Sequence, residues 1–566
     1  MRTDPIKTAV EANKDLFIAA LGFSAAMSIL ALTSSFYMLQ IYDRVLTSRS
    51  EDTLLLLTAI AVGGITAFAA LDSLRVRLLM RAGLRVSNAL AGDVLRAMVA
   101  TACRNGGMQV RAGLRDVETI RHFAASPCFT ALMDLPFVLV YLFVLALLHP
   151  VFLAIVLVGG MILVLVALVS ERMVTPVLAE GMGLSMRAHA FAEDGLRNSS
   201  VLEGMGMSRT FCARWHRHWL DSLQKMTQAL DRDSRLSSLS KAVRMLIQIA
   251  LLGAGAMLIL DFRATGGVMI GASIIGARAL APIETIISTW KNLIATRQAW
   301  KRLSQLMHSA PDREEGMALP APSGWLLAAG LHFASPATRR AILSNVSFDL
   351  APGESLGIIG PSGSGKSTLL RLLVGAWPCS SGIVRLDGAD IYAWPREALC
   401  RFVGYLPQDV ELFTGTVREN IARMTEGDPE AVVRAACRAH AHEMILGLPQ
   451  GYETQIGENG HDLSGGQAQR IGIARAFYGD PRLVLLDEPN ANLDSVGEDA
   501  LVTAIADLKR QGVTLVIVAH RPSILSSVDK MLVLRADGTV EAFGPRAEIM
   551  QRFTRPAIMP FATAGR

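Results

Sequence analysis

Residues Gly360-Pro361-Ser362-Gly363-Ser364-Gly365-Lys366-Ser367 decide the fold of the C-terminal half, because they fit the pattern GxxxxGK[ST]. A strand-like apolar run, 355–359, precedes them, and a helix-like run begins at Thr368. Glycines allow consecutive backbone N–H groups to surround phosphate oxygens at a helix N-terminus. We predict that 360–368 bind the phosphates of a nucleotide, with Lys366 beside the outer phosphates and Ser367 as a ligand of Mg²⁺.

A second motif lies further along the chain, where an apolar run over 483–486 ends in Asp487 and Glu488. Such a run is typical of a buried parallel strand. A carboxylate at its end is placed to hold Mg²⁺, and the next one is placed to deprotonate an attacking water. We therefore predict that Asp487 is a metal ligand and that Glu488 is the general base.

A third motif, Ser464-Gly465-Gly466-Gln467, stands at the start of a predicted helix. Small residues and free N–H groups at a helix N-terminus again favour an anion. One domain does not need two phosphate sites for one nucleotide, whereas two copies that face each other would use both. The pattern therefore predicts a homodimer in which residues 464–467 of each chain complete the phosphate site of the partner chain.

Together these motifs resemble, over about 325–566, the nucleotide-binding domain of ATP-binding-cassette (ABC) transporters. The resemblance implies ATP and Mg²⁺ as cofactors. By resemblance, Gln408 senses Mg²⁺, and Asp494 belongs to the family's D-loop, residues 492–494. His520 contacts the γ-phosphate of ATP and is catalytic, as are Lys366 and Glu488. Residues 463–467 resemble the family signature, and residues 454–460 resemble the segment that exporters carry before it. Ser335 departs from the pattern, because the family stacks adenine on an aromatic ring at this position.

The N-terminal half is a membrane domain by composition. The 566 residues are 51% hydrophobic and only 19% charged, and an ordinary soluble domain is about a quarter charged. Apolar stretches of membrane-spanning length occur six times. We predict a transmembrane domain over 1–310, a linker over 311–324 and the α/β P-loop NTPase domain of the ABC type over 325–566. The predicted spans are 16–42, 54–74, 128–148, 151–171, 243–262 and 265–289.

Charge sets the predicted orientation. Two long polar stretches, 72–127 and 171–242, are rich in arginine, and the short loops between paired spans carry few cations. The positive-inside rule then makes the long stretches and both termini cytoplasmic, and we read the stretches as helices that extend beyond the bilayer. The net charge of +5 is too small to indicate nucleic acid as a partner. The six cysteines are far apart, which indicates reduced thiols.

Polar residues at membrane depth are candidates for function. Asp134 and Glu284 lie near the ends of predicted spans, so an interfacial position is the alternative. We expect Gln40, Ser273 and Glu284 to be among the few polar groups that line a path between the spans.

The arrangement of six spans and one ATPase domain resembles an ABC exporter half-transporter. Residues 36–46, 134–137, 276–284 and 487–494 are similar to motifs of the protease-secreting (PrtD-like) branch of type I secretion exporters. Only about fifteen residues precede the first span, so an N-terminal peptidase domain is not expected.

The resemblance implies a bacterial inner-membrane ATPase that exports an unfolded polypeptide with a C-terminal signal. Membrane lipids, a periplasmic membrane-fusion adaptor and an outer-membrane channel are its implied partners. A lipid or drug flippase of the same fold is the alternative. A transporter-like regulator whose ATPase gates another process is a third class. The complete set of Lys366, Asp487, Glu488 and His520 argues against an inactive regulator.

Overall fold

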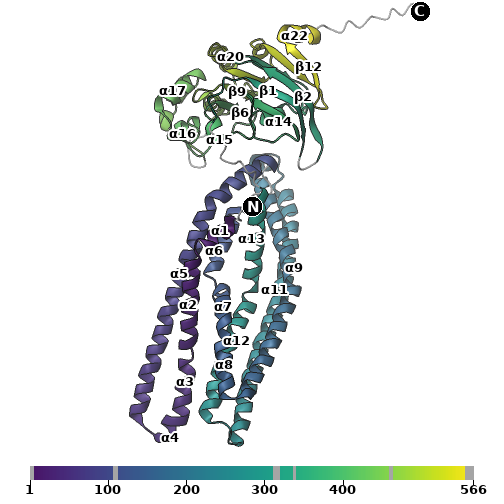
Figure 1. The fold of residues 1–566 in the computed structure, drawn as a ribbon. Helices are drawn as coiled ribbons and strands as arrows, with labels where there is room; N and C mark the ends of the chain where they lie inside the picture. The colour runs from purple at the N-terminus through teal and green to yellow at the C-terminus, as the bar shows by residue number, and fades with distance from the viewer. Residues whose placement is uncertain (1–4, 106–112, 310–318, 336–338, 458–462, 555–566) are drawn as a thin grey trace, which may run out of the picture. The chain divides into compact units, whose positions relative to one another are not determined.

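The structure is a computed structural model that describes residues 5–105, 113–309, 319–335, 339–457 and 463–554. The chain divides into two compact units. Met1–Val99 and Gln109–Ala310 form the helical first unit, and Ala100–Met108 and Pro311–Arg566 form the α/β second unit. Figure 1 follows the chain through both. Part of the predicted linker, 311–318, lies outside the described residues.

Among the described residues of the first unit, six helical segments are long and apolar enough to cross a membrane, which confirms the number of predicted spans. The long polar stretches are helical, as predicted: α5, α9 and α11 continue far past the apolar segments. The helices are α1 (Pro5–Glu11), α2 (Lys14–Leu30), α3 (Thr33–Gln40), the π-helical η1 (Ile41–Val45), α4 (Leu46–Ser48), α5 (Glu51–Asn105), α6 (Gly113–Ala124), α7 (Pro127–Asp134), the 3-10 turn η2 (Leu135–Phe137), α8 (Val138–Leu148), α9 (Pro150–Arg197), α10 (Ser199–Gly204), α11 (Ser208–Leu260), α12 (Gly266–Ser288) and α13 (Trp290–Ser309).

The predicted third span is not one continuous α-helix. Pro136 lies in η2, which separates α7 from α8. Proline has no N–H to donate and its ring crowds the preceding turn, so a regular helix is interrupted there. The next helix uses proline in the opposite way: Pro150 opens α9, where the missing donor costs nothing, and His149 caps it.

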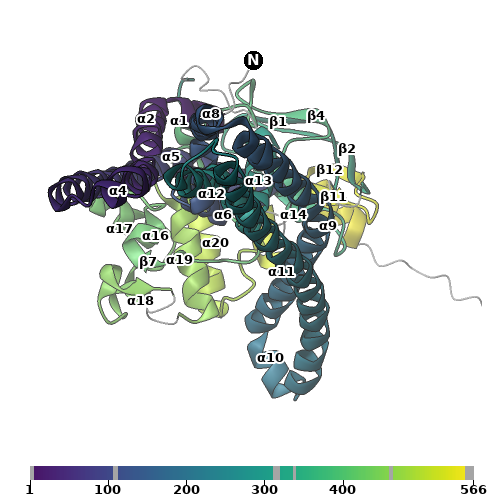
Figure 2. The ribbon, with the colours of Figure 1, turned by 90° about the horizontal axis from the view of Figure 1, so that it is seen from below.

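Glycines allow α9 and α11 to pack closely against each other. Figure 2 shows α9 and α11 side by side, with α10 at the turn between them. A Cβ at Gly159 would lie 2.3 Å from Ile247 Cδ1, and one at Gly195 would lie 2.2 Å from Phe211 Cζ. Larger side chains would force the helices apart. Close packing through small residues is how helices associate where no hydrophobic effect drives them.

The carboxylates predicted at membrane depth both have cationic partners. The Arg75 guanidinium, with a side chain only 7% exposed, donates to Asp134 Oδ1 at 2.6 Å and to Asp72 Oδ1 at 2.8 Å. It also donates to Ser24 Oγ at 2.9 Å, so α2, α5 and α7 meet at one buried charge. Glu284 pairs with Arg244 at 3.2 Å. These partners were not predicted, because their positions in sequence are distant.

The expectation that Ser273 lines an open path is wrong. Its residue surface is 6% exposed, and its hydroxyl donates to the carbonyl of Ile270, three positions earlier in the same helix, at 2.9 Å. A serine hydroxyl that is hydrogen-bonded to a carbonyl of its own helix needs no polar path beside it.

We expect Asp134→Asn to destabilise the first unit by about 1.5–3 kcal/mol, because the buried arginine loses its nearest charge and keeps only Asp72. Thermal unfolding of the detergent-solubilised protein would measure the loss. Asp72→Asn is the matched control and should cost less, because the Asp72 side chain is 45% exposed. The double change Arg75→Met with Asp134→Leu should recover most of the loss. Equal stability of the two single variants would contradict this account.

The described part of the second unit contains three sheets. A four-stranded antiparallel sheet has the order β2-β1-β4-β5, a six-stranded sheet has the order β12-β11-β3-β10-β9-β6, and β7 pairs with β8. The strands are β1 (Leu326–Ala334), β2 (Ala341–Leu350), β3 (Ser355–Ile359), β4 (Ser381–Leu386), β5 (Ala389–Asp390), β6 (Val403–Leu406), β7 (Gly415–Thr416), β8 (Gln455–Ile456), β9 (Leu483–Asp487), β10 (Thr514–Val518), β11 (Lys530–Leu534) and β12 (Val540–Pro545). The helices are α14 (Lys366–Leu373), α15 (Arg396–Leu399), α16 (Val417–Ile421), α17 (Pro429–Arg438), α18 (His442–Leu446), the 3-10 turn η3 (Gly451–Glu453), α19 (Gly465–Phe477), α20 (Ser495–Arg510), α21 (Pro522–Leu525) and α22 (Arg546–Thr554).

The central strands β3, β10, β9 and β6 are parallel, and β9 and β10 are buried at every residue. Two apolar cores cover the faces of this sheet. Ligands of open α/β sheets bind at the carboxyl ends of the strands. All predicted catalytic motifs follow these strands, so the topology brings them to one edge.

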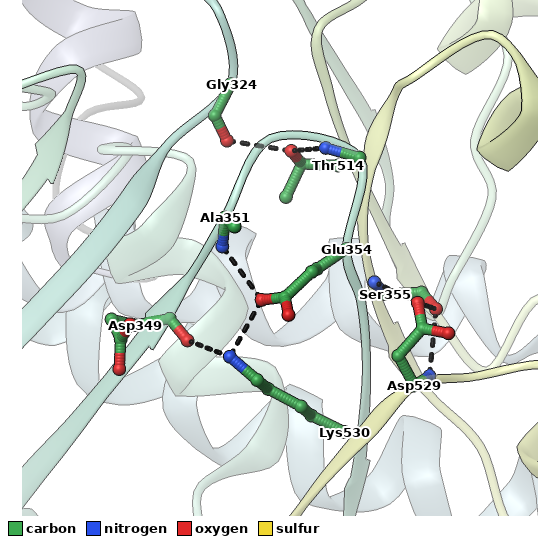
Figure 3. A network of polar contacts seen from close by, with 9 residues as sticks. Gly324, Asp349, Ala351, Glu354, Ser355, Thr514, Asp529 and Lys530 are labelled. Carbon is green, nitrogen blue, oxygen red and sulfur yellow. Dashed lines mark hydrogen bonds and ion pairs between the residues drawn. The ribbon is translucent and has the colours of Figure 1, made fainter. Parts of the chain in front are cut away.

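A polar network joins the amino ends of three strands of the six-stranded sheet, opposite the edge where the motifs lie (Figure 3). Asp529 accepts hydrogen bonds from the backbone and hydroxyl of Ser355, and Lys530 pairs with Glu354 at 2.7 Å. The Thr514 hydroxyl donates to the carbonyl of Gly324 at 2.7 Å. Partial burial raises the pKa of Asp529, but its bonds to Lys509 and Ser355 outweigh this and leave the pKa below its ordinary value. The network fixes the starting points of β3, β10 and β11.

Candidate nucleotide-binding and hydrolysis site

The phosphate-binding loop connects β3 to α14. Gly363 and Gly365 have φ values of 81° and 91°, a region that favours glycine. A Cβ at Gly360 would lie 2.6 Å from the carbonyl oxygen of Leu534. The Lys366 ammonium donates to the carbonyls of Gly360 and Pro361 at 2.9 and 3.0 Å, which holds its charge inside the loop. The geometry therefore presents backbone N–H groups and one ammonium to a phosphate.

Asp487 ends β9 and is 1% exposed. Neither of its carboxylate oxygens has a hydrogen-bond partner among the described residues. Burial raises the pKa of Asp487, and the Ser367 hydroxyl lies close enough to lower it in part, although no hydrogen bond of ordinary geometry joins the two. A buried carboxylate without partners is costly unless a cation neutralises it.

These groups fit Mg²⁺. The ion prefers oxygen ligands and is usually held by one or two carboxylates together with phosphate oxygens and water. Asp487, the Ser367 hydroxyl and the Gln408 amide oxygen supply such donors. Within the described ranges no group of three or more His, Cys, Asp and Glu side chains forms a metal site, so the ion would depend on the nucleotide for its other ligands.

Glu488 lies between Gln408 and His520. The Gln408 amide donates to Glu488 Oε2 at 3.5 Å, a long contact, and His520 Nε2 lies 3.3 Å from Glu488 Oε1. The backbone of Glu488 has a φ of 47°, which is uncommon outside glycine. Its N–H donates to the carbonyl of Val518 on the neighbouring β10 at 2.9 Å. Residues that follow β6, β9 and β10 thus converge on one carboxylate.

The signature caps the helix that follows it. Ser464 and Gln467 form a capping box at the start of α19, with the Ser464 hydroxyl accepting from the Gln467 N–H and the Gln467 side chain accepting from the Ser464 N–H. A Cβ at Gly466 would lie 2.9 Å from the carbonyl oxygen of Asn492. The signature glycines therefore allow the D-loop to approach the helix start.

Asp494 caps α20 and connects it to α19. It accepts from the Gly497 N–H at 2.9 Å and pairs with Arg470 at 3.0 Å. The Gly497 N–H and the Arg470 guanidinium lower the pKa of Asp494. Across the described parts of the chain, no hydrogen bond or ion pair joins Ser464, Gly465 or Gly466 to the phosphate-binding loop. The structure thus separates the predicted residues into a loop-and-carboxylate cluster and a signature-and-D-loop cluster.

Gln469 was not singled out from the sequence. It is 0% exposed, and its amide donates to the carbonyl of Pro489, directly after Glu488, at 3.0 Å. This bond connects α19 to the residue that follows Glu488. A polar residue on the otherwise apolar inner face of α19 was the available signal.

Ser335 supplies no ring, as the sequence indicates. Its N–H donates to the carbonyl of Arg340 at 3.0 Å, and its carbonyl accepts from Arg339 at 2.8 Å. The nearby rings of Phe333 and Trp377 stack on each other, with centroids 5.1 Å apart, and the Arg371 guanidinium lies 4.8 Å from the Trp377 ring. Residues 336–338 lie outside the described residues.

The comparisons with known proteins agree with this architecture. Residues 17–275 match the ABC transporter transmembrane region family, and residues 343–491 match the ABC transporter family. The chain is 40% identical to the type I secretion system ATP-binding protein PrsD of Rhizobium meliloti (strain 1021), over 94% of this chain and 92% of that protein. It is 30% identical to the cyclolysin secretion/processing ATP-binding protein CyaB of Bordetella pertussis, over 94% of this chain and 75% of that protein.

Similarity to solved structures supports the fold. A bacterial Atm1-family ABC exporter with ATP bound superposes with a TM-score of 0.81 at 22% identity, over 95% of this chain and 96% of that one. The six apolar helices, the phosphate-binding loop and the relatives point to one assignment. The chain belongs to the ABC transporters, in the group of multi-pass ATP-binding exporters of type I secretion systems.

Proposed function

We propose that this chain is the ATP-driven inner-membrane subunit of a type I secretion system and that it exports an unfolded polypeptide as a homodimer. The convergence of Gln408 and His520 on Glu488, beside the buried Asp487, carries the ATPase part of the proposal. The 40% identity to PrsD over nearly the whole chain supports the secretion part.

Each side chain has a proposed role. Lys366 and the N–H groups of 360–368 bind the phosphates, and Ser367, Gln408 and Asp487 hold Mg²⁺, which neutralises phosphate charge when bound. Glu488 accepts the proton of the attacking water, and His520 orients Glu488 and contacts the γ-phosphate. Ser464, Gly465, Gly466 and Gln467, with Asp494, act on the nucleotide of the partner subunit.

The cargo is proposed to pass as an extended chain. Twelve helices of about 10 Å diameter enclose a path suited to an extended strand rather than to a folded domain. A C-terminal signal, a periplasmic membrane-fusion adaptor and an outer-membrane channel complete the proposed pathway. The long polar extensions and the ATPase unit are assigned to the cytoplasm, because the arginine-rich stretches flank the spans on that side.

Transplantation of the signal tests the export of polypeptide. The C-terminal segment of a protein encoded beside the exporter, fused to a slow-folding reporter, should direct that reporter into the medium. Export should require Lys366 and the outer-membrane channel, because both energy and a continuous path are needed. A fast-folding version of the same reporter is the matched control and should stay inside. Equal export without the C-terminal segment, or ATPase stimulated by lipid but not by polypeptide, would favour the flippase alternative.

A further inference from the structure

A cavity of about 660 Å³ lies between α9 and α13 in the first unit. Its volume falls within the range of roughly 300–1,000 Å³ that is typical of ligand pockets. Glu171 and Thr175 come from α9, and the α13 lining includes Trp290, Arg297 and Lys301. The cavity is separate from the nucleotide site, which belongs to the second unit.

Two buried hydrogen-bond donors of the cavity lining have no acceptor among the described residues. The indole N–H of Trp290 and the hydroxyl of Thr175 are buried and have no partner among the described residues. The Arg297 side chain is 84% exposed, and its guanidinium lies 3.9 Å from the Glu171 carboxylate. The two groups therefore do not form a close ion pair. A buried donor without an acceptor is costly, so these atoms indicate an acceptor-rich ligand.

The remaining lining is apolar. Leu293, Ile294, Trp290 and Trp300 all line the cavity. Indole rings bind apolar side chains over a large area and still present an N–H to a polar group. A ligand that fits would therefore carry apolar side chains, carbonyl oxygens and negative charge in one segment.

We infer that this cavity binds the exported polypeptide through an extended segment that alternates apolar and acidic residues. Backbone carbonyls of the segment accept from Trp290 and Thr175, its carboxylates pair with Arg297 and Lys301, and its apolar side chains contact the indole rings. A lipid fits less well, because the lining residues begin where the predicted spans 151–171 and 265–289 end. The inference rests on the proposed export of polypeptide and adds where, and by what chemistry, the cargo is first held.

Two fluorescent peptides of equal length test the inference on the full-length dimer in lipid nanodiscs. One alternates Val or Phe with Asp, and the other has Lys in place of each Asp. The acidic peptide should bind at least tenfold more tightly. Arg297→Glu with Lys301→Glu should reverse this preference, and Trp290→Phe, which removes only the N–H donor, should weaken binding severalfold. Arg263→Glu, in the exposed turn before α12, and Trp219→Ala, on α11, are the matched controls and should change nothing.

Basal ATPase activity should be the same in all these variants, because none lies in the nucleotide site. A photo-crosslinker at Gln298 should capture the acidic peptide. Equal affinity of the wild type for both peptides, or unchanged binding by the charge-reversed variant, would overturn the inference. So would displacement of the peptide by phosphatidylglycerol, or a Gln298 crosslink to the partner protomer that added peptide does not reduce. Normal secretion by the charge-reversed variant would remove the cavity from the pathway and leave the export function intact, whereas no secretion by the wild type would refute export itself.

Discussion

Replacing Glu488 by Gln should lower ATP turnover by a factor on the order of 10²–10⁴, because the variant keeps the shape of the side chain and loses the base. Glutamine can still meet Gln408 and His520, so the geometry of the site should survive. ATP binding should persist, and ATP-bound dimers of the nucleotide-binding units should accumulate. Steady-state phosphate release and nucleotide binding, measured on the same preparation, would establish both effects.

Glu453→Gln is a suitable control for this substitution. Glu453 is an acidic residue of the same unit that pairs with Arg418 at 2.7 Å, away from the three converging side chains. Its variant should hydrolyse ATP normally. Near-normal hydrolysis by Glu488→Gln would instead transfer the role of base to another group, with His520 the first to examine.

Heterodimers should reveal that each ATP site is shared between two chains. A Lys366→Ala subunit paired with a Ser464→Arg subunit contains one site with both an intact loop and an intact signature. If the two sites act independently, the purified heterodimer should retain up to about half of the wild-type hydrolysis, because symmetric dimers carry two equal sites. Both homodimers should be inactive. Two affinity tags allow the heterodimer to be isolated from the homodimers.

The matched control places both substitutions in one chain and pairs it with a wild-type chain. Each shared site then carries one defect, so this heterodimer should be inactive. Sites built within one chain predict the reverse order of activity for the two heterodimers. Ser464 also caps α19, and losing a cap costs roughly 0.5–2 kcal/mol, so thermal unfolding of Ser464→Arg should be measured beside its activity.

The loop and carboxylate part of the nucleotide site could be predicted from the sequence because its chemistry is local. Residues 360–368 and the pair Asp487 and Glu488 each follow a buried apolar strand, and parallel strands bring their carboxyl ends to one edge whatever the order of the strands. Gln408 and His520, separated by more than a hundred positions, were placed near Glu488 by resemblance alone, and their contacts with it emerged only from the strand order β10-β9-β6.

Ion pairs between helices that are distant in sequence could not be predicted from local patterns. The arginine that neutralises Asp134 lies 59 positions away on another helix, and no local pattern marks it. The prediction for Ser273 was wrong because its hydroxyl has a partner within its own helix. A hydroxyl at membrane depth can bond to its own backbone as readily as to groups in a polar path. The cavity between α9 and α13 could not be predicted from the sequence. Its lining residues are typical of amphipathic helices, and they form a cavity only where the two helices meet.

The glycine contacts between α9 and α11 have a mechanical consequence. The helices contain 48 and 53 residues, so each is roughly 70–80 Å long. Joined along their length, they resist bending far better than either would alone and behave as one stiff lever. A rotation of about 5° at one end then moves the other by about 6 Å, more than one helical turn. Bulky residues at Gly159 or Gly195 would separate the helices, and the pair would then bend more and carry a movement over a shorter distance.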